Sequence, residues 1–205
     1  MAEIHFYAPP QKHGLKHDPL KAIVAPRPIG WISTVDAQGV VNLAPYSFFN
    51  AFSSRPAIVG FSSEKISDSL NNARETGEFV FNLATAPLAL QMNTTSTAVL
   101  PQVDEMALAG LAGAPCRIVR APRVAASPAA LECKVLQIIH LHDLDGAPTA
   151  AHLVLGQVVG VHVDMAFVRD GIFDTVGAQT LARCGYWSDY TVVRDIFDMP
   201  RPPNP

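Results

Sequence analysis

Two long runs of branched and apolar residues in the second half of the chain constrain the fold most strongly. Residues 131–141 (LECKVLQIIHL) and 152–163 (HLVLGQVVGVHV) have the composition of strands, and the turn-forming residues 143–148 separate them. Alternation along the later run predicts two unequal faces, of which the more apolar one is interrupted only by Gln157, as in an antiparallel sheet. The apolar face would hold Leu153, Leu155, Val159, Val161 and Val163, and the opposite face His152, Gly156, Gly160 and His162.

Shorter strand-like runs occupy the first half of the chain, with little helix between them. Strands are predicted at residues 29–35, 40–43, 57–61 and 79–83, and short helices at 67–74, 86–92 and 103–111. One or two helical turns with Asp18 as cap are predicted at residues 19–24. Strands joined by short turns favour a closed or nearly closed antiparallel barrel over a parallel α/β sheet. The sequence therefore predicts a mainly β fold with short helices.

Composition indicates one globular domain with a buried interior. The chain has 205 residues, of which 49% are hydrophobic and 16% charged. We predict an N-terminal arm at residues 1–18, a single domain at 19–198 and a C-terminal tail at 199–205. The formal net charge of −3, without a basic run, argues against nucleic acid or an acidic membrane surface as a partner.

The same composition bears on location. No signal-peptide pattern and no apolar run long enough for a membrane helix is present, so we expect a cytoplasmic protein. Three widely spaced cysteines form neither a disulfide framework nor a CxxC metal pair, and we expect them to be reduced thiols.

Residues 61–69 (FSSEKISDS) form the first candidate site, between a predicted strand and a predicted helix. Four hydroxyls and the Lys65 ammonium gather there, and the N–H groups of the first helical turn point toward the same space. This chemistry suits a phosphate group. The alternative is ordinary helix capping by Ser67 or Asp68, with the other serines exposed to solvent.

Residues 42–50 (NLAPYSFFN) form the second candidate site. A proline, an aromatic residue and a serine follow directly on a strand, so irregular backbone could pair with a planar ligand. Tyr46, Phe48 or Phe49 could supply stacking or walls. The alternative is a core segment with two buried phenylalanines.

Other chemistry-bearing residues carry weaker signals. His140 and His142 share one face of a strand, but no third ligand follows at a clear spacing, so we predict no metal site. Cys184 beside Arg183 lacks an obvious histidine partner and is better explained as a structural cysteine. The motifs GxSxG, HExxH, GxGxxG and Walker A are absent from the sequence, which removes the usual support for hydrolase, zinc-protease, Rossmann and nucleotide-triphosphatase functions.

Taken in order, these segments resemble the flavin reductase-like family of FMN-binding split barrels. The resemblance covers nearly the whole chain, and its order and spacing are more specific than any one piece. The matching pieces are RPIGWIST from Arg27, NLAPYSFFN from Asn42, residues 56–63, SDSLNN from Ser67, TGEFVFNL from Thr76, residues 93–96, Ser127-Pro128, Leu131-Glu132-Cys133, and Arg183-Cys184-Gly185-Tyr186 with Tyr190.

The resemblance implies an antiparallel, Greek-key-like split barrel that binds FMN and works as a homodimer. It also implies a role for particular side chains. Ser62, Ser63, Lys65 and Ser69 would hold the phosphate, Ala44, Pro45, Tyr46 and Ser47 would border the isoalloxazine, Ser33 and Thr34 would lie near the ribityl chain with Asn82 close by, and Arg183, Tyr186, Trp187 or Tyr190 would close the site.

Two departures from the family pattern concern this site. Ser67-Asp68-Ser69 stands where a basic residue followed by Asp-Thr is frequent, which removes one positive charge near the phosphate. Trp187 adds bulk beside the nicotinamide entrance.

Three functions follow from the resemblance. The first is an NADH- or NADPH-dependent flavin reductase that transfers a hydride to flavin and could supply a monooxygenase with reduced flavin. The second is an FMN-binding relay or storage protein without nicotinamide activity. The third is an FMN oxidase of a small organic substrate. In each, the cofactor carries the chemistry, so the sequence predicts no catalytic side chain.

Overall fold

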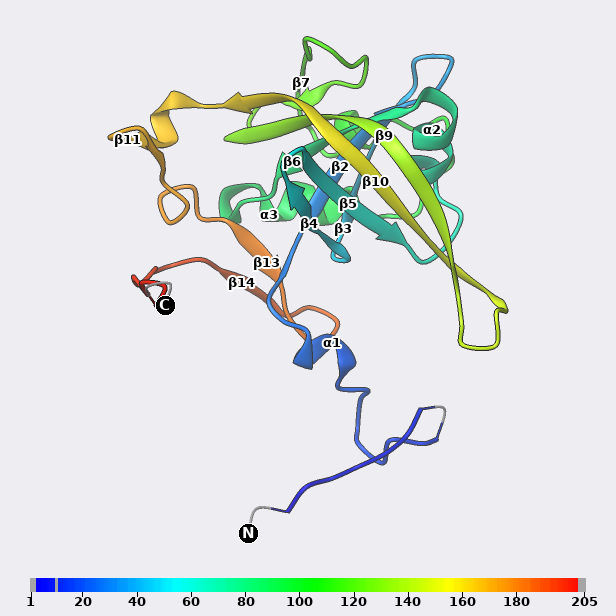
Figure 1. Cartoon of the computed structure of the whole chain (residues 1–205). Helices are drawn as coiled ribbons and strands as arrows, with labels where there is room; N and C mark the ends of the chain where they lie inside the picture. The colour runs from blue at the N-terminus through cyan, green and yellow to red at the C-terminus, as the bar shows by residue number, and fades with distance from the viewer. Residues whose placement is uncertain (1–2, 10, 203–205) are drawn as a thin grey trace.

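The computed structural model describes residues 3–9 and 11–202, and its centre is a seven-stranded antiparallel sheet (Figure 1). Residues 1–2 and 10 of the predicted arm and 203–205 of the predicted tail lie outside the described residues. The strand order in this sheet is β3-β2-β6-β9-β10-β5-β4. The strands span Gly30–Val35 (β2), Val41–Tyr46 (β3), Phe49–Ser54 (β4), Ala57–Ser63 (β5), Glu78–Leu83 (β6), Ala129–His142 (β9) and Pro148–Val163 (β10).

Three smaller sheets lie beside the main one. The first joins the N-terminal part of the chain to its C-terminal part, because β1 pairs with β13 and β13 pairs with β14. The other two are the pairs β7–β8 and β11–β12. Their strands span Arg27–Pro28 (β1), Gly113–Ala114 (β7), Arg123–Val124 (β8), Val168–Arg169 (β11), Ile172–Phe173 (β12), Leu181–Arg183 (β13) and Tyr190–Val192 (β14).

The helices are short, and the sequence located each of them to within a few residues. Ser67 caps α2 through a bond from the Leu70 N–H to its Oγ, and Gly77 ends this helix in the left-handed conformation at φ 69°. Asp18 accepts the Leu20 N–H at 2.9 Å, just before α1. The helices span Leu20–Ile23 (α1), Asp68–Thr76 (α2), Ala89–Thr94 (α3) and Glu105–Leu108 (α4), with 3₁₀ turns at Ala86–Leu88 (η1) and Met165–Phe167 (η2).

The mainly β prediction is confirmed, but the sheet stays open. Strands β3 and β4 form its two edges, and among the described residues no ladder joins them. Only Ser47 and Phe48 connect the two strands, so the sheet turns back at this corner. β4 itself was not predicted, because its sequence FNAFSS lacks the branched residues that mark the other strands.

The predicted faces of β10 are wrong. Val154, Gly156 and Val158 face the core, and Val154 is fully buried while Val161 is 63% exposed. A register shift between Val158 and Gly160 inserts one extra residue, which reverses the alternation along the rest of the strand. A sequence pattern with a strict period of two cannot show such a bulge.

The core has a large cluster on the side of the sheet where α2 packs. Ile32, Phe61, Leu70, Phe79 and Val154 are fully buried there. A second cluster around Trp31, which is also fully buried, packs α3 and α4 against β2 and β3. These two clusters hold the amino end of α2 and the free edge of β3 in fixed positions.

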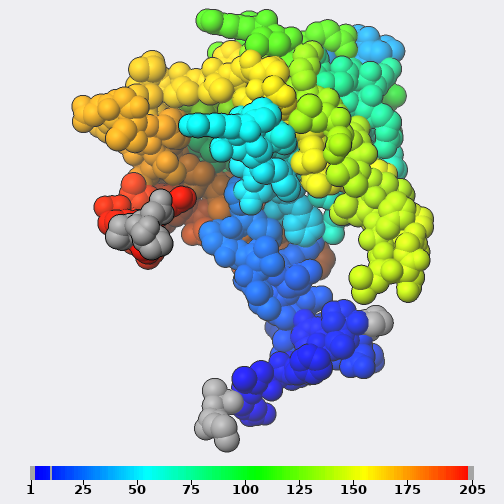
Figure 2. All heavy atoms as spheres, viewed as in Figure 1, coloured from blue at the N-terminus to red at the C-terminus, as the bar shows by residue number. Residues whose placement is uncertain are grey.

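Two segments project from this body. The N-terminal segment before α1 reaches well away from the sheet, and the tip of the β9–β10 hairpin extends beyond its neighbours (Figures 1 and 2). No helix of the described residues is both long and apolar enough to cross a bilayer.

We predict that Gly156→Ala destabilises the fold by about 1–3 kcal/mol, because it overpacks a tight core. An added Cβ would overlap with Phe79 Cε1 and would lie 3.1 Å from Cys133 Cβ. The matched control is Gly113→Ala, whose Cβ would meet no atom closer than Met106 Sδ at 3.2 Å and Pro122 Cβ at 3.3 Å. Urea unfolding measures both variants, and equal midpoints for the two would contradict the packing argument.

Candidate functional site

A groove runs beside the free edge of β3. Two adjoining cavities of about 310 and 360 Å³ share Pro45 and Ser96 and together form what we call the β3 groove. One end is lined by residues that include Asn42, Ala44, Tyr46, Lys65, Ser67, Thr95 and Glu105, and the other by residues that include Lys21, Arg27, Ser47, Asn93, Arg183, Trp187 and Tyr190.

The edge of β3 supplies the groove with backbone polar groups. β3 pairs with β2 on one side only, and the Leu43 N–H on the other side donates to Glu105 Oε2 at 3.2 Å. Since backbone groups alternate along a strand, the Pro45 carbonyl points the same way as the Leu43 N–H. This edge therefore offers a backbone acceptor in the middle of the groove, and Ser47 lines the groove just past the end of the strand.

A cluster of hydroxyls lies where the groove meets the amino end of α2. Ser67 Oγ lies 2.9 Å from the Tyr46 hydroxyl and 3.0 Å from Ser63 Oγ. Ser63 also donates to the Lys65 carbonyl at 2.7 Å, which shapes the loop that carries the exposed Lys65 side chain. Burial raises the pKa of Tyr46 above its usual value despite these hydroxyl contacts, so Tyr46 stays neutral and can donate a hydrogen bond.

Ser33 and Asn82 lie behind the groove rather than in it. Both side chains are fully buried, and Asn82 Nδ2 donates to Ser33 Oγ and to the Trp31 carbonyl, each at 3.1 Å. Ser33 in turn donates to the Pro122 carbonyl at 2.6 Å, and Asn82 Oδ1 accepts the Val124 N–H at 2.7 Å. Their polar atoms thus fasten β2 and β6 to the segment around β8.

Thr34 and Ser69 are buried too, and they hold a residue that does reach the groove. Asn42 Nδ2 donates to Ser69 Oγ at 2.7 Å and to Thr34 Oγ1 at 3.2 Å. Asn72 of α2 donates to the same Thr34 Oγ1 at 3.1 Å. Ser62 lines a neighbouring cavity with Phe48, which shares Arg27 and Ser47 with the β3 groove, and its N–H donates to the Phe48 carbonyl at 2.7 Å.

The far end of the groove is bounded by residues around β13 and β14. The Arg183 guanidinium lies 4.5 Å from the centre of the Tyr190 ring and donates to the Trp187 carbonyl at 2.5 Å. Trp187 is 87% exposed at the groove margin. Tyr186 lies in a neighbouring cavity, with its ring 5.3 Å from His17.

Arg27 holds this end of the groove together. Its guanidinium donates to the carbonyls of Lys21, Val24 and Cys184, the last at 2.7 Å. One buried side chain thereby fixes α1 against the β13–β14 turn. Burial, reinforced by the nearby charge of Arg183, lowers the pKa of Arg27.

Several groove residues were missed by the sequence analysis. Glu105 is buried, and its burial raises the pKa of the carboxyl even though the Leu43 N–H bonds to it. Thr95 accepts a bond from Trp31 Nε1 at 2.9 Å, which places Ser96 at the groove wall. The resemblance marked residues 93–96, but no local pattern singles out Glu105, because its contacts are made with a strand 62 positions earlier.

Residues 24–174 match the model of the flavin reductase like domain. The chain belongs to the flavin reductase like family. An uncharacterized protein of Deinococcus radiodurans is 33% identical over 213 residues, which cover 98% of this chain and 91% of that relative.

Solved structures of this family share the fold. Nitrilotriacetate monooxygenase component B from Bacillus cereus superposes with a TM-score of 0.88 at 25% identity, covering 97% of this chain and all of that one. A Shewanella frigidimarina protein with a split barrel domain has a TM-score of 0.76 at 23% identity and covers 89% and 90% of the two chains. The flavin reductase like domain of this chain is therefore a split barrel.

A second polar centre lies outside the groove, at Glu132. Three possible metal ligands, from Cys116, Glu132 and His162, lie within 4.8 Å of one another. The Glu132 carboxylate already accepts four bonds, from His162 Nε2 at 2.6 Å and from three backbone N–H groups. These N–H groups belong to Arg117, Ile118 and Val119. A metal ion would have to displace these donors, so the geometry fits a structural carboxylate.

We predict that Glu132→Gln lowers stability at neutral pH. Burial alone would raise the pKa of Glu132, but the N–H donors and His162 outweigh it and lower the pKa to about 2. A carboxyl with a lowered pKa stabilises the fold above its unfolded value near 4.5, and this contribution is lost as pH falls toward 2. The difference between the pKa of Glu132 in the unfolded and the folded state corresponds to roughly 3 kcal/mol of folding stability at pH 7.

Urea unfolding between pH 7 and pH 2.5 measures this effect. The gap between the native protein and Glu132→Gln should be largest above pH 5 and should narrow on acidification. Glu64→Gln is the control, because Glu64 is exposed and only 3.5 Å from Lys21 Nζ in a surface pair. A gap that stays constant with pH would rule out the carboxylate charge as its source.

Proposed function

We propose that this protein binds FMN in the β3 groove and acts as a flavin reductase that takes its hydride from NADH or NADPH. The observation that carries the proposal is that two parts of the groove present different polar groups. One end combines Lys65, hydroxyls and the amino end of a nine-residue helix, and the middle offers the free backbone edge of β3. A phosphate attached to a planar heterocycle needs both features.

The phosphate end fits on chemical grounds. The N–H groups of the first turn of α2 and the Lys65 ammonium favour an anion, and Ser67 Oγ, which caps the helix by accepting the Leu70 N–H, lies at the same place. Ser63 and Tyr46 hold Ser67 in position, so this end is organised before a ligand arrives. Ser62 lines the neighbouring cavity and would act through the backbone of this loop.

The ring end is formed by backbone, as the family resemblance implies. The Pro45 carbonyl and the Ser47 N–H can pair with the edge of a heterocycle, while Ala44 and Tyr46 border it. We assign Ser33, Thr34, Ser69 and Asn82 as positioning residues, because their polar atoms bond to protein groups behind β3. Thr34 and Ser69 would act by holding the side chain of Asn42, which lines the groove.

Bound FMN would supply a two-electron acceptor that a nicotinamide can reduce by hydride transfer. The protein's part is to hold the ring by the β3 edge and to keep one ring face open. Arg183 and Tyr190 would limit access of water at the far end, since they pack together at the groove margin. Trp187 is 87% exposed and the N-terminal segment points away, which supports an open groove (Figure 1).

We further propose a homodimer that hands reduced flavin to a monooxygenase. The likeness to a monooxygenase component B supports the partner. Exposed apolar side chains near the hairpin end of β9 support the dimer, because isolated monomers rarely expose such clusters without a use. They are Leu136, Ile139 and Leu141.

We predict that Lys65→Ala weakens FMN binding about tenfold, because one charge-assisted contact to the phosphate is lost. Quenching of flavin fluorescence during titration measures the dissociation constant. Lys16→Ala is the matched control, since Lys16 is an exposed lysine of the N-terminal segment outside the groove. Equal affinity in the two variants would remove Lys65 from the phosphate site.

The activity itself is tested by following NADH and NADPH oxidation with and without added FMN. Rapid FMN-dependent oxidation is the expected result. A protein that binds FMN but oxidises neither nicotinamide would be a relay or storage protein, or an oxidase of a small organic substrate. A protein that cannot be loaded with FMN would overturn the flavin proposal.

A further inference from the structure

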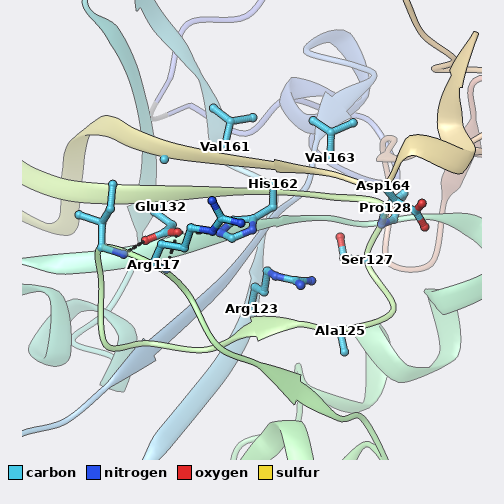
Figure 3. Close-up of a pocket in the computed structure, with 12 residues that line it drawn as sticks. Arg117, Arg123, Ala125, Ser127, Pro128, Glu132, Val161, His162, Val163 and Asp164 are labelled. Atoms are coloured by element: carbon cyan, nitrogen blue, oxygen red, sulfur yellow. Dashed lines mark hydrogen bonds and ion pairs between the residues drawn. The ribbon is translucent and has the colours of Figure 1, made fainter.

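A second cleft, of about 590 Å³, lies away from the β3 groove and shares no lining residue with it. One wall is the segment of residues 117–128, which includes β8, and the other is formed by residues 160–163 at the end of β10 (Figure 3). Nothing in the proposed flavin chemistry uses this cleft.

The cleft contains two arginines without a carboxylate partner. Arg117 and Arg123 line it, and within the described residues neither guanidinium forms an ion pair. In Figure 3 the Arg123 side chain extends from β8 into the space below His162. The cleft also contains the carboxylates of Glu132 and Asp164, so it is distinguished by two guanidinium groups that have no ion-pair partner on one concave surface, and not by an excess of positive charge.

Arg123 is also partly desolvated. Its Nε is buried and has no hydrogen-bond partner among the described residues. A guanidinium that has lost water without gaining a partner pays a desolvation cost, and an anion at its terminal nitrogens would offset this cost. The planar fork of arginine matches a phosphate or carboxylate group in two contacts.

The carboxylates of the cleft do not fill this role. Glu132 lies at its floor, but its oxygens already accept three backbone N–H groups and His162 Nε2. Asp164 lines the cleft as well, and its Oδ1 accepts the Ala166 N–H at 2.9 Å. Because Glu132 holds the backbone N–H of Arg117, it positions the loop that carries this guanidinium.

We infer that this cleft is a second anion site, which takes a phosphate group between Arg117 and Arg123. The phosphate could be inorganic or could belong to a small phosphorylated molecule, since the two guanidinium groups recognise the dianion itself. The inference does not rest on the proposed flavin reductase activity, because the cleft and the β3 groove have separate residues.

The test is isothermal titration calorimetry of the full chain at low ionic strength, with inorganic phosphate as the first probe and pyrophosphate as the second. We expect saturable binding that Arg123→Ala weakens at least tenfold. Arg194→Ala removes an exposed arginine outside the cleft and serves as the matched control. Because phosphate could also bind at α2, the titration is repeated in Lys65→Ala, where binding to the arginine cleft should persist.

Three results would overturn the inference. They are no saturable binding at millimolar phosphate, equal affinity in Arg123→Ala and Arg194→Ala, and loss of binding in Lys65→Ala alone. The last would place the phosphate in the β3 groove. If Arg123→Ala does not fold, as judged by its circular dichroism, Arg117→Ala and Arg123→Lys replace it, and both should bind more weakly than the native chain. A greater effect of pyrophosphate than of phosphate would favour a phosphorylated small molecule as the natural ligand.

Discussion

Strand β3 is hydrogen-bonded to β2 on one side only, and the polar backbone groups of its other edge must be satisfied from outside the sheet. Glu105 satisfies the first of them at Leu43. Pro45 has no backbone N–H, so the free edge of β3 has one unpaired donor fewer that another strand could bind. Toward Ser47 the edge stays open, and this is the part that borders the groove. A ligand with polar atoms along one edge can complete what the sheet leaves unpaired.

The groove keeps its shape because polar residues behind it are fully bonded. Asn42 joins Thr34 of β2 to Ser69 of α2, so the sheet edge and the amino end of the helix cannot move independently. Tyr46 and Ser67 make a second link between the same two elements. Buried polar groups are costly when they lack partners, and these bonds fix the distance between the edge of β3 and the amino end of α2.

The sequence predicted those elements whose signals are local. The α2 helix was located by its capping serine and its terminal glycine, and the long hairpin by its branched residues and turn. The faces of β10 were wrong because a single extra residue reverses the alternation, and that residue is recognised only by its partners on β9. The placement of Ser33 and Asn82 near the ribityl chain stays a prediction, while the bonds of these two side chains to Pro122 and Val124, more than 40 positions away, are known only from the structure. Such contacts depend on topology that a linear pattern does not contain.

Glu132 orders the backbone beside the cleft that contains Arg117 and Arg123 without forming an ion pair with either guanidinium group. Three consecutive backbone N–H groups converge on this carboxylate, and His162 approaches it from β10. The Glu132 oxygens therefore bind the backbone of residues 117–119, and the guanidinium groups of Arg117 and Arg123 remain available to a ligand. Gly160 is required in the same place, because an added Cβ would lie 3.1 Å from the Glu132 carboxyl carbon and would press on the group that orders the loop. The course of the chain at residues 117–119 and the need for glycine at position 160 thus both depend on one buried residue.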